Sequence, residues 1–556
     1  MRPHAAQRGL TRHRTGGRMT AMDDTLPRVP GSAPLQNGVW SLVLPGAERL
    51  LCRAETPPAF LGELARRGTR IDIVSRCAHE SWRESALAGT DGVRCLWEPD
   101  ADVDYDAAMI WDPVRGDDVR NWLLSLHALR ALPRELALWS RNPLQHAGAP
   151  HWWRMDGWLD RRGWRPGAAY LGLPEPERVR QLVDWDAYTR TALVRHRRSD
   201  QAWKAWMTRR PAWRWMQPAR LRRASLHSVT PAPSILESVL ADVACASNAS
   251  PYVERILSSP NGAAIVVLHL LAAGGARRAV LKVPFAATAD ARVARNAAAL
   301  EWIGARGAAL GRWNATAPRF LARGTSNGWF WTLEEWVEGS DAQSWDPAAK
   351  DGATTQLGDY LGHLASLGQP ARALDDAGLA VLCGNALGAA SALLPRTLAE
   401  RLQVVRARLY DALRGVPVPL VPRHGDFKLE NVLGDAARPE TWRVLDWELW
   451  TAQGAPLLDA WHLVASRRAR DAGCAMGSAV RRWLLAGELN PHEHQLVQRL
   501  AQGLDPRYVE LSPVLYWLDR IGPIAARGDW PTPAWASTNV AQVLDALVAR
   551  TVEVGA

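Results

Sequence analysis

Short apolar runs alternate with amphipathic stretches from residue 38 to about residue 186. The apolar runs have the length of strands, and the stretches between them place apolar residues at helical spacing. This alternation predicts a Rossmann-like, doubly wound parallel sheet in an N-terminal domain, residues 37–186. The segments that carry the prediction are VWSLVLPG (39–46), PPAFLGELARRG (57–68), RIDIVSR (70–76), YDAAMIWDP (105–113), DVRNWLLSLHALRALP (118–133) and ELALWSRNP (135–143).

A different pattern begins near Cys245. Two apolar runs flank a Gly-Gly turn, an alanine-rich helical stretch follows, and a second hairpin ends at Gly339. Beyond it the pattern is mostly helical, except around residues 420–448. We therefore expect a β-rich lobe at 245–339 and a helical lobe at 340–556.

Composition sets limits on the class of protein. The chain has 556 residues, 47% apolar and 22% charged, which predicts two or three globular domains. No apolar run reaches the roughly 20 residues that span a bilayer. The six cysteines are scattered without zinc spacing, which favours a reduced, cytoplasmic protein. Residues 1–36 are rich in Pro, Gly and Arg, and we expect a disordered arm there.

Much of the net charge of +10 lies in one stretch. Residues 190–223 contain eleven Arg or Lys and one acid, Asp200, interleaved with tryptophans. We expect a basic, Trp-rich linker at 187–244 that packs its tryptophans between two domains. A peripheral contact with an anionic membrane, at the inner membrane surface, is the alternative reading. Nucleic acid is the least favoured partner.

Four polar residues in the second half have the spacing that phosphoryl transfer needs. Asp426 and Asn431 lie in HGDFKLEN (424–431), and Asp446 ends the apolar run of VLDWE (444–448). A carboxylate that accepts the hydroxyl proton, oxygen ligands for Mg²⁺ and a cation for the phosphates are the parts of such a site. Lys282, on the strand after the Gly-Gly turn, is the candidate cation. The chain has only four lysines, and Lys428, two residues after Asp426, is another of them.

Together, HGDFKLEN, VLDWE and PLLD (456–459) resemble the aminoglycoside phosphotransferase / choline kinase family over roughly residues 245–540. The resemblance implies a bilobal protein-kinase-like fold and an ATP- and Mg²⁺-dependent kinase that acts on a small-molecule or glycan hydroxyl. It implies the following roles: Asp426 as catalytic base, Asn431 and Asp446 as metal ligands, and Lys282 on the nucleotide phosphates. It also places the adenine against backbone groups of 333–339, including Glu335 and Val337, and gives His424 and Asp459 structural roles. The place of Lys428 resembles the D-x-K-x-x-N arrangement of protein kinases, in which the lysine steadies the transferring phosphoryl group.

Two features depart from the family pattern. The helix after the lysine strand has Asn296 where the family has a glutamate, and Glu301 lies five residues further on, well off the same helix face. Either Glu301 substitutes through a register shift, or the site is slower or altered. The nucleotide loop SSPNG (258–262) has one glycine and is not a Walker A motif. A protein kinase proper is less favoured, because Asp446 lies only thirteen residues before Asp459 and no activation segment fits between them.

The order of elements at 37–186 resembles a class I S-adenosylmethionine methyltransferase, although the expected glycine-rich loop is absent from LVLPGAERLL (42–51). We therefore expect a degenerate module used for docking or substrate presentation. Two alternatives to a kinase stay open: a catalytically impaired scaffold, and a bifunctional methyltransferase–kinase of envelope polysaccharide.

The acceptor is constrained by charge. From Ala460 to the end the chain has ten Arg against nine acids, without an acidic cluster. A polycationic aminoglycoside would require an acidic surface. A sugar, a nucleoside or a lipid-linked glycan is therefore at least as good an acceptor.

Overall fold

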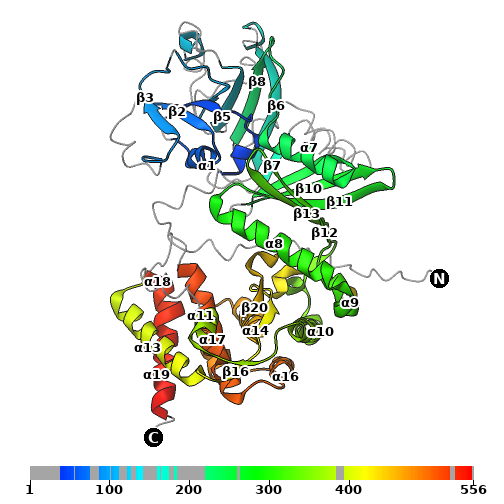
Figure 1. The fold of residues 1–556 in the computed structure, drawn as a ribbon, viewed down its shortest axis with the longest axis vertical. Coiled ribbons are helices and arrows are strands. Elements are labelled where there is room, and N and C mark those ends of the chain that lie inside the picture. Colours follow the sequence, from blue (N-terminus) through cyan, green and yellow to red (C-terminus); the bar gives the residue numbers. More distant parts are fainter. Residues whose placement is uncertain are drawn as a thin grey trace, which may run out of the picture.

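Strands gather in one half of the molecule and helices in the other, with the long helix α8 between them (Figure 1). The computed structural model describes residues 38–54, 57–75, 87–100, 102–111, 122–126, 133–141, 159–162, 164–173, 181–184, 219–258, 263–383, 394–525 and 533–553. We call the described residues from 38 to 226 the N-terminal module, 235–335 the strand-rich lobe and 340–553 the helical lobe.

Five parallel strands form the core of the N-terminal module in the order β3-β2-β1-β4-β5. β4 is buried along its whole length, as expected for a parallel strand covered on both faces. The segments predicted at 70–76, 105–113 and 135–143 do form strands. The elements are β1 (Arg49–Arg53), α1 (Phe60–Arg66), β2 (Arg70–Val74), β3 (Val93–Leu96), β4 (Ala107–Ile110) and β5 (Glu135–Arg141).

The prediction for residues 39–46 was wrong. Most of this segment lies in the 3₁₀-helix η2 (Gly38–Val43), and the first strand begins only at Arg49. An apolar run of this length suits a buried helical turn as well as a strand. The parallel strand order fits a doubly wound sheet, but residues 76–86 and most of the β4–β5 connection lie outside the described residues. The Rossmann-like arrangement of helices on both faces therefore stays a prediction.

The sheet continues from the N-terminal module into the strand-rich lobe. β5 pairs antiparallel with β8 (Ala219–Leu226), followed by β6 (Trp164–Leu173) and β7 (Gln181–Asp184). β7 then pairs with β9 (Ser250–Ser258) through two residues, which makes one sheet of thirteen strands. The predicted linker 187–244 thus includes a strand of this sheet. Its basic, Trp-rich part before residue 219 lies outside the described residues.

The strand-rich lobe is an antiparallel sheet with one helix before its first strand in sequence and a second helix between its third and fourth strands. Both predicted hairpins are present, β10–β11 and β12–β13, and Gly275 has the positive φ of 101° that the first turn requires. Ser234 and Glu237 cap α7 reciprocally. The elements are α7 (Ile235–Ser247), β10 (Ala263–Ala272), β11 (Gly275–Pro284), α8 (Ala287–Ala305), β12 (Phe320–Ser326) and β13 (Trp329–Glu335).

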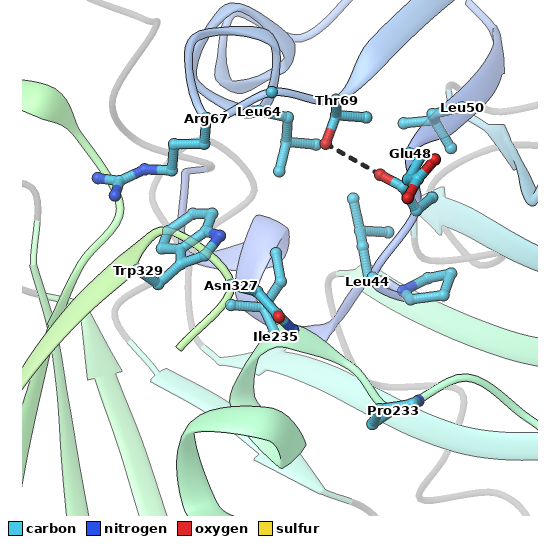
Figure 2. A pocket seen from close by; sticks show the side chains of 14 residues that line it. Leu44, Glu48, Leu50, Leu64, Arg67, Thr69, Pro233, Ile235, Asn327 and Trp329 are labelled. Atoms are coloured by element: carbon cyan, nitrogen blue, oxygen red, sulfur yellow. Dashed lines mark hydrogen bonds between the residues drawn. The ribbon is translucent and has the colours of Figure 1, made fainter. Parts of the chain in front are cut away.

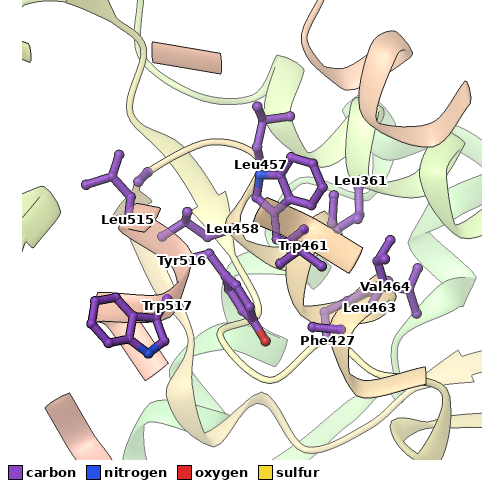
Figure 3. Packing of buried hydrophobic residues seen from close by; sticks show 14 of the residues in the cluster. Leu361, Phe427, Leu457, Leu458, Trp461, Leu463, Val464, Leu515, Tyr516 and Trp517 are labelled. Carbon is purple, nitrogen blue, oxygen red and sulfur yellow. The ribbon is translucent and has the colours of Figure 1, made fainter. Parts of the chain in front are cut away.

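The helical lobe packs around one apolar core, in which Phe427, Trp461 and Tyr516 lie close together (Figure 3). Its longer helices are α10 (Pro347–Ser366), α11 (Asp376–Cys383), α13 (Arg396–Leu413), α14 (Leu458–Asp471), α16 (Pro491–Leu500), α17 (Pro506–Ala525) and α19 (Gln542–Glu553). Short strands interrupt the helices where the motifs lie: β17 (Val421–Arg423), β18 (Val432–Asp435), β19 (Arg438–Val444) and β20 (Thr451–Gly454).

The remaining elements are single turns or very short pairs. They are α9 (Gly307–Leu310), η4 (Gly311–Thr316), β14 (Ser340–Asp341), η5 (Ala342–Ser344), β15 (Arg372–Ala373), β16 (Pro417–Val418), η6 (Leu429–Asn431), η7 (Trp447–Leu449), α15 (Met476–Ala479), the π-helix η8 (Val480–Leu485), α18 (Pro533–Ala536) and η9 (Ser537–Ala541). Among the described residues, no helix combines the length and the apolar character needed to cross a membrane.

Candidate active site

The loop from His424 to Asn431 follows β17, and hydrogen bonds to Asp459 fix its first two residues. The Asp459 carboxylate accepts hydrogen bonds from the backbone N–H groups of His424 (2.6 Å) and Gly425 (3.0 Å). Gly425 has a φ of 84°, and a Cβ at this position would collide with the backbone of Leu449. The chain can therefore make this turn only with glycine, and the turn directs Asp426 out of the loop.

His424 connects the loop to the segment that carries Asp446. Its Nε2 lies 2.8 Å from the carbonyl oxygen of Leu445, and its Nδ1 accepts the backbone N–H of Asp426 at 3.1 Å. An Nδ1 that accepts leaves the ring proton on Nε2, so the ring is neutral. Burial lowers the pKa of His424, which agrees with this state. The histidine therefore fixes the loop in place.

Four side chains surround the Asp426 carboxylate. His462 Nε2 and the Arg520 guanidinium lie 2.9 and 3.0 Å from Oδ1. Lys428 Nζ and Asn431 Nδ2 lie 2.9 and 3.2 Å from Oδ2. Each oxygen thus has two donors, and the side chain is still 16% exposed. The group is strongly held but can be reached from solvent.

These neighbours determine the charges in the loop. Burial alone would raise the pKa of Asp426, but the His462 hydrogen bond and the charges of Arg520 and Lys428 hold it well below its usual range. Burial and Arg520 lower the pKa of His462 to about 4. His462 is therefore neutral at pH 7, donates from Nε2 to Asp426 and accepts at Nδ1 from the Tyr516 hydroxyl, 2.9 Å away.

Lys282 lies in a second polar cluster, on the strand-rich lobe. Its Nζ is 3.0 Å from Oε1 of Glu334 and 3.3 Å from Oδ1 of Asn296. Asn296 Nδ2 in turn donates to Oε2 of Glu334 at 3.0 Å. All three side chains are buried. Burial acts to lower the pKa of Lys282, but the charges of Glu334, Asp446 and Glu448 raise it, so the lysine stays charged.

Glu301 does not substitute for the missing helix glutamate. Its carboxylate pairs with Arg323 at 3.3 Å, on a partly exposed part of the lobe. The carboxylate that pairs with Lys282 comes instead from β13. In the β11–β13 register Lys282 faces Thr332 and Val280 faces Glu334, so Lys282 and Glu334 are diagonal neighbours on one face of the sheet. The expectation of a register shift at Glu301 is corrected in this way.

Comparison with known proteins now bears on this arrangement. Residues 267–496 match the model of the phosphotransferase enzyme family, a range that contains Lys282 and both motif loops. The C-terminal half of the chain contains a phosphotransferase-family domain. The resemblance stated for this half is confirmed.

Solved structures are similar to this phosphotransferase domain at low identity. An aminoglycoside phosphotransferase of Streptomyces rimosus is 20% identical, with 52% of this chain and 97% of that chain covered and a TM-score of 0.32. A choline/ethanolamine kinase family protein of Mesorhizobium loti is 18% identical, with 50% and 84% covered and a TM-score of 0.29. No curated protein matches the chain.

A methyltransferase is also among the similar structures. The 1,6-didemethyltoxoflavin-N1-methyltransferase of Burkholderia thailandensis is 12% identical, with 35% of this chain and 76% of that chain covered and a TM-score of 0.21. A score this low carries no argument, and the methyltransferase resemblance of residues 37–186 stays a prediction. The segment after β1, AETPPA (54–59), contains two prolines and no glycine.

Asp446 of the phosphotransferase domain has an uncommon backbone conformation. Its φ and ψ are 65° and 55°, in the left-handed region, where Asp is tolerated better than most residues. The backbone N–H of the next residue, Trp447, donates to Oδ1 of Asn296 at 3.1 Å. Asn296 thus connects the Lys282–Glu334 pair directly to the segment that presents Asp446.

Asn431 and Asp446 are the residues of the phosphotransferase domain that could hold Mg²⁺. The amide nitrogen of Asn431 donates to the backbone oxygen and the carboxylate of Asp426, which leaves the amide oxygen for a cation. Of the described residues, none donates a hydrogen bond to the Asp446 side chain. A carboxylate and an amide oxygen suit Mg²⁺, which takes few protein ligands and completes its shell with phosphate and water. The described residues include no cluster of three or more His, Cys, Asp or Glu placed to hold a metal alone.

Glu335 and Val337 lie at the end of β13 and just after it. The Glu335 backbone N–H donates to the Arg319 carbonyl at 2.9 Å, and its side chain accepts from the Arg319 N–H at 3.3 Å. Both residues are half-buried. Backbone groups of both residues are expected to bind the adenine.

Sequence reasoning missed three residues of this site: Glu334, His462 and Arg520. Glu334 stands next to Glu335 in the predicted strand, and period-two alternation could have placed it on the face of Lys282. His462 lies three residues after Asp459, on the same helix face, so its spacing carried a usable signal. Arg520 lies 94 residues after Asp426, and no local pattern indicates their contact.

Proposed function

We propose that this protein is an ATP- and Mg²⁺-dependent phosphotransferase that phosphorylates a hydroxyl group on a small molecule or glycan. The observation that carries the proposal is the Asp426 carboxylate, held by four donors yet open to solvent, in a loop bonded through His424 to the Asp446 segment. The match of residues 267–496 to the phosphotransferase enzyme family supports it.

In the proposed reaction the acceptor hydroxyl oxygen bonds to the γ-phosphorus, the bond from that phosphorus to the β–γ bridging oxygen breaks, and ADP leaves. Asp426 orients the hydroxyl and receives its proton. Because the pKa of Asp426 is so low, it is a weak base toward the free alcohol. Asp426 takes up the proton only late in the transfer, when the new O–P bond has made the hydroxyl acidic. The main contribution of Asp426 is therefore to orient the hydroxyl.

The Asp426 side chain is 16% exposed, and the acceptor hydroxyl gains a full hydrogen-bonding place on its carboxylate when one of the four donors withdraws. Asn431, His462 and Arg520 are each fixed by further contacts or by burial, whereas Lys428 is 30% exposed. We infer that Lys428 leaves Oδ2 when substrates bind and moves to the transferring phosphoryl group. This gives Lys428 the role that its resemblance to the lysine of the protein-kinase D-x-K-x-x-N arrangement implies.

Lys282 would bind the α- and β-phosphates, kept in place by Glu334 and Asn296. Asn431 and Asp446 would hold Mg²⁺, which supplies positive charge against the phosphate oxygens. Backbone groups of Glu335 and Val337 would bind the adenine, since they continue the strand next to β11. Each role takes a residue type suited to the partner.

A neutral acceptor fits the helical lobe better than a polycation. The carboxylates close to Asp426 are already in use: Asp459 by the loop backbone, and Asp519 by Arg423 at 2.9 Å. A polycationic substrate would need carboxylates that are not neutralised in this way. A sugar or nucleoside hydroxyl is therefore the acceptor class we propose.

The impaired-scaffold alternative rested on Asn296 and on the glycine-poor first module, and Glu334 weakens the first of these two grounds. The lysine keeps a carboxylate at 3.0 Å, supplied by another element. A bifunctional methyltransferase–kinase has no support from the loop after β1, which lacks the glycines that let a cofactor approach the backbone.

Replacing Asp426 by Asn tests the proposal. With ATP, Mg²⁺ and a panel of sugars and nucleosides, the variant is expected to lose about 10³-fold in turnover or more, because a positioned acid–base group contributes 10²–10⁴. Its affinity for ATP should stay within about twofold, a change of under about 0.5 kcal/mol.

The matched control is Glu301→Gln, which removes a carboxylate paired only on the lobe surface. Turnover that survives in Asp426→Asn would overturn the assignment of Asp426. A wild-type melting temperature that does not rise with millimolar ATP and Mg²⁺ would favour the scaffold instead, because a ligand of the native state must raise it.

A further inference from the structure

Helix α1 of the N-terminal module touches the first turn of α8 in the phosphotransferase domain. The residue before α8, Ala286, offers no side-chain cap, and the first backbone N–H groups of a helix need partners. The N–H of Ala287 donates instead to Oε2 of Glu63, 3.1 Å away and 224 residues earlier in the chain. Glu63 is buried, so α8 receives its cap from another module.

Arg67, one turn after Glu63, makes the contact between α1 and α8 specific. Its guanidinium binds both carboxylate oxygens of Asp290, in the first turn of α8, at 2.8 and 3.1 Å. It also donates to Glu63 at 3.0 Å and to the Gly328 carbonyl in the β12–β13 turn at 2.9 Å. Its carbon Cζ lies 4.2 Å from the ring centre of Trp329.

The Arg67 side chain is 8% exposed and that of Asp290 is 41% exposed, so the guanidinium side of these contacts is shielded from solvent. Figure 2 shows Arg67 extending past Trp329 at one side of a pocket of about 380 Å³, which residues of both parts line. Beneath it the two parts share one apolar core: Leu61 and Leu64 belong to the same buried cluster as Trp329 and Trp331. The junction is therefore packed as a domain interior, which limits relative movement.

α8 connects this junction to the lysine cluster (Lys282, Asn296 and Glu334). Asn296 lies nine residues after Ala287, about 13 Å along a helix that rises 1.5 Å per residue. The Asn296 side chain binds Lys282, Glu334 and the Trp447 backbone. Hydrogen bonds of 3.0 to 3.3 Å do not survive a shift of the helix by even about 1 Å.

From this geometry we infer that the N-terminal module is a part of the nucleotide site: through Glu63 and Arg67 it fixes α8, and through α8 it positions Asn296 and Lys282. Glu63 and Arg67 are positioning residues, since they contact no substrate. Such a positioning role requires no cofactor in the N-terminal module, whose segment after β1 has no glycine, and it rests on the proposed function only where it concerns nucleotide binding.

The test compares Arg67→Met and Glu63→Gln with the wild type in the full chain. Hydrogen exchange of the backbone amides at 287–300 needs no nucleotide, and we expect it to accelerate about tenfold or more in both variants, because local opening becomes easier. The Kd for ATP should rise about tenfold, in the usual range of coupling between distant sites. Once ATP is saturating, kcat should fall by less than the affinity does.

Arg94→Met is the matched control within the N-terminal module. Arg94 binds Asp72 at 2.6 Å between β2 and β3, and among the described residues the ion pairs of Arg94 involve no residue of α1 or α8. This variant destabilises the module without touching the junction, so it should leave exchange at 287–300 and the Kd for ATP unchanged. Arg67→Lys keeps the charge and should recover part of the ATP affinity.

The outcomes separate the inference from the proposed function. Unchanged exchange at 287–300 in Arg67→Met and Glu63→Gln would overturn the inference, whatever the enzyme does. An equal loss of protection in Arg94→Met would also overturn it, since the effect would then reflect general stability. If the wild type binds no ATP, the proposed function fails, and the exchange measurement still decides whether the N-terminal module holds α8.

Discussion

Each lobe contributes one polar cluster to the proposed active site, and the two clusters are built differently. The lysine cluster takes its members from adjacent elements of the strand-rich lobe: β11, β13 and α8. The aspartate cluster (Asp426, Lys428, Asn431, His462 and Arg520) takes its members from the motif loop and from two helices, 36 and 94 residues further along the chain.

A sequence motif identifies residues that are close in the chain, whereas a contact in the folded protein can be made by a residue of any element. In the aspartate cluster Lys428 and Asn431 contact Asp426 of the same motif directly. In the lysine cluster the helix position carries Asn296, and the carboxylate has moved to β13. Lys282 nevertheless has a carboxylate 3.0 Å away, because a buried lysine needs a negative partner to stay charged.

For the lysine cluster, the largest effect we expect comes from a test of this exchange of position. Glu334→Gln leaves Lys282 between two amides, and Asn296→Asp places two carboxylates 3.0 Å apart, where Asn296 now donates to Glu334. Each single change should lower kcat/KM for ATP about a hundredfold, a transition-state cost of about 3 kcal/mol, which is typical of breaking a buried pair.

The double variant Asn296→Asp with Glu334→Gln restores one carboxylate and one amide in the same shape. The amide introduced on β13 can donate to the carboxylate introduced on α8, so we expect most of the activity to return. The double-mutant cycle should give a coupling of about 2 kcal/mol. Additive losses would show that Asn296 and Glu334 act independently, and Glu335→Gln serves as the control on the neighbouring carboxylate.

The sequence predicts those residues that contiguous motifs carry: Asp426, Asn431, Asp446, Lys428 and Lys282. The local sequence around each of these residues indicates its place in a loop or strand, whatever the rest of the fold. Glu334, by contrast, meets Lys282 across a hydrogen-bonded strand pair, and its role depends on the β11–β13 register. Arg520 reaches Asp426 only because α17 packs under the loop, which is a property of the whole lobe.

The elements of the fold likewise divide into those with a local signal in the sequence and those without one. Hairpins with a glycine turn and amphipathic helices were predicted well, because their signals are local. η2 was predicted as a strand because an apolar run of six residues suits either element once it is fully buried. The pairing of β5 with β8, some 80 residues later in the chain, has no local signal, and neither has the cap that Glu63 supplies to α8.

A smaller effect concerns the pH dependence of stability in the aspartate cluster. The pKa of His462 is lowered to about 4 in the folded state, against about 6.5 in an unfolded chain. Between these values the unfolded chain binds one more proton, so the free energy of unfolding decreases as the pH falls from about 6.5 to about 4. The loss should be about 2 kcal/mol.

His462→Gln keeps a donor for Asp426 and removes the titration. Urea denaturation of both proteins at pH 7.5 and 4.5 should show the wild type losing about 2 kcal/mol relative to the variant on acidification. His492→Gln, an exposed histidine on α16, is the control. A wild type that parallels His462→Gln across this range would show that His462 is not held neutral by the cluster.

The smallest effect we expect concerns Lys428, the donor of the aspartate cluster that we infer to move. Lys428→Met should lower kcat about tenfold, less than the 10² or more for a buried oxyanion donor, because Lys428 is partly exposed and solvent screens its charge. The Kd for ATP should not change, since the lysine reaches the phosphoryl group only during transfer. Lys350→Met, which removes another lysine paired with an aspartate at 3.0 Å, is the matched control. A rise in Kd with kcat intact would show instead that Lys428 binds ATP in the ground state, and the two clusters would then share the work of holding the nucleotide.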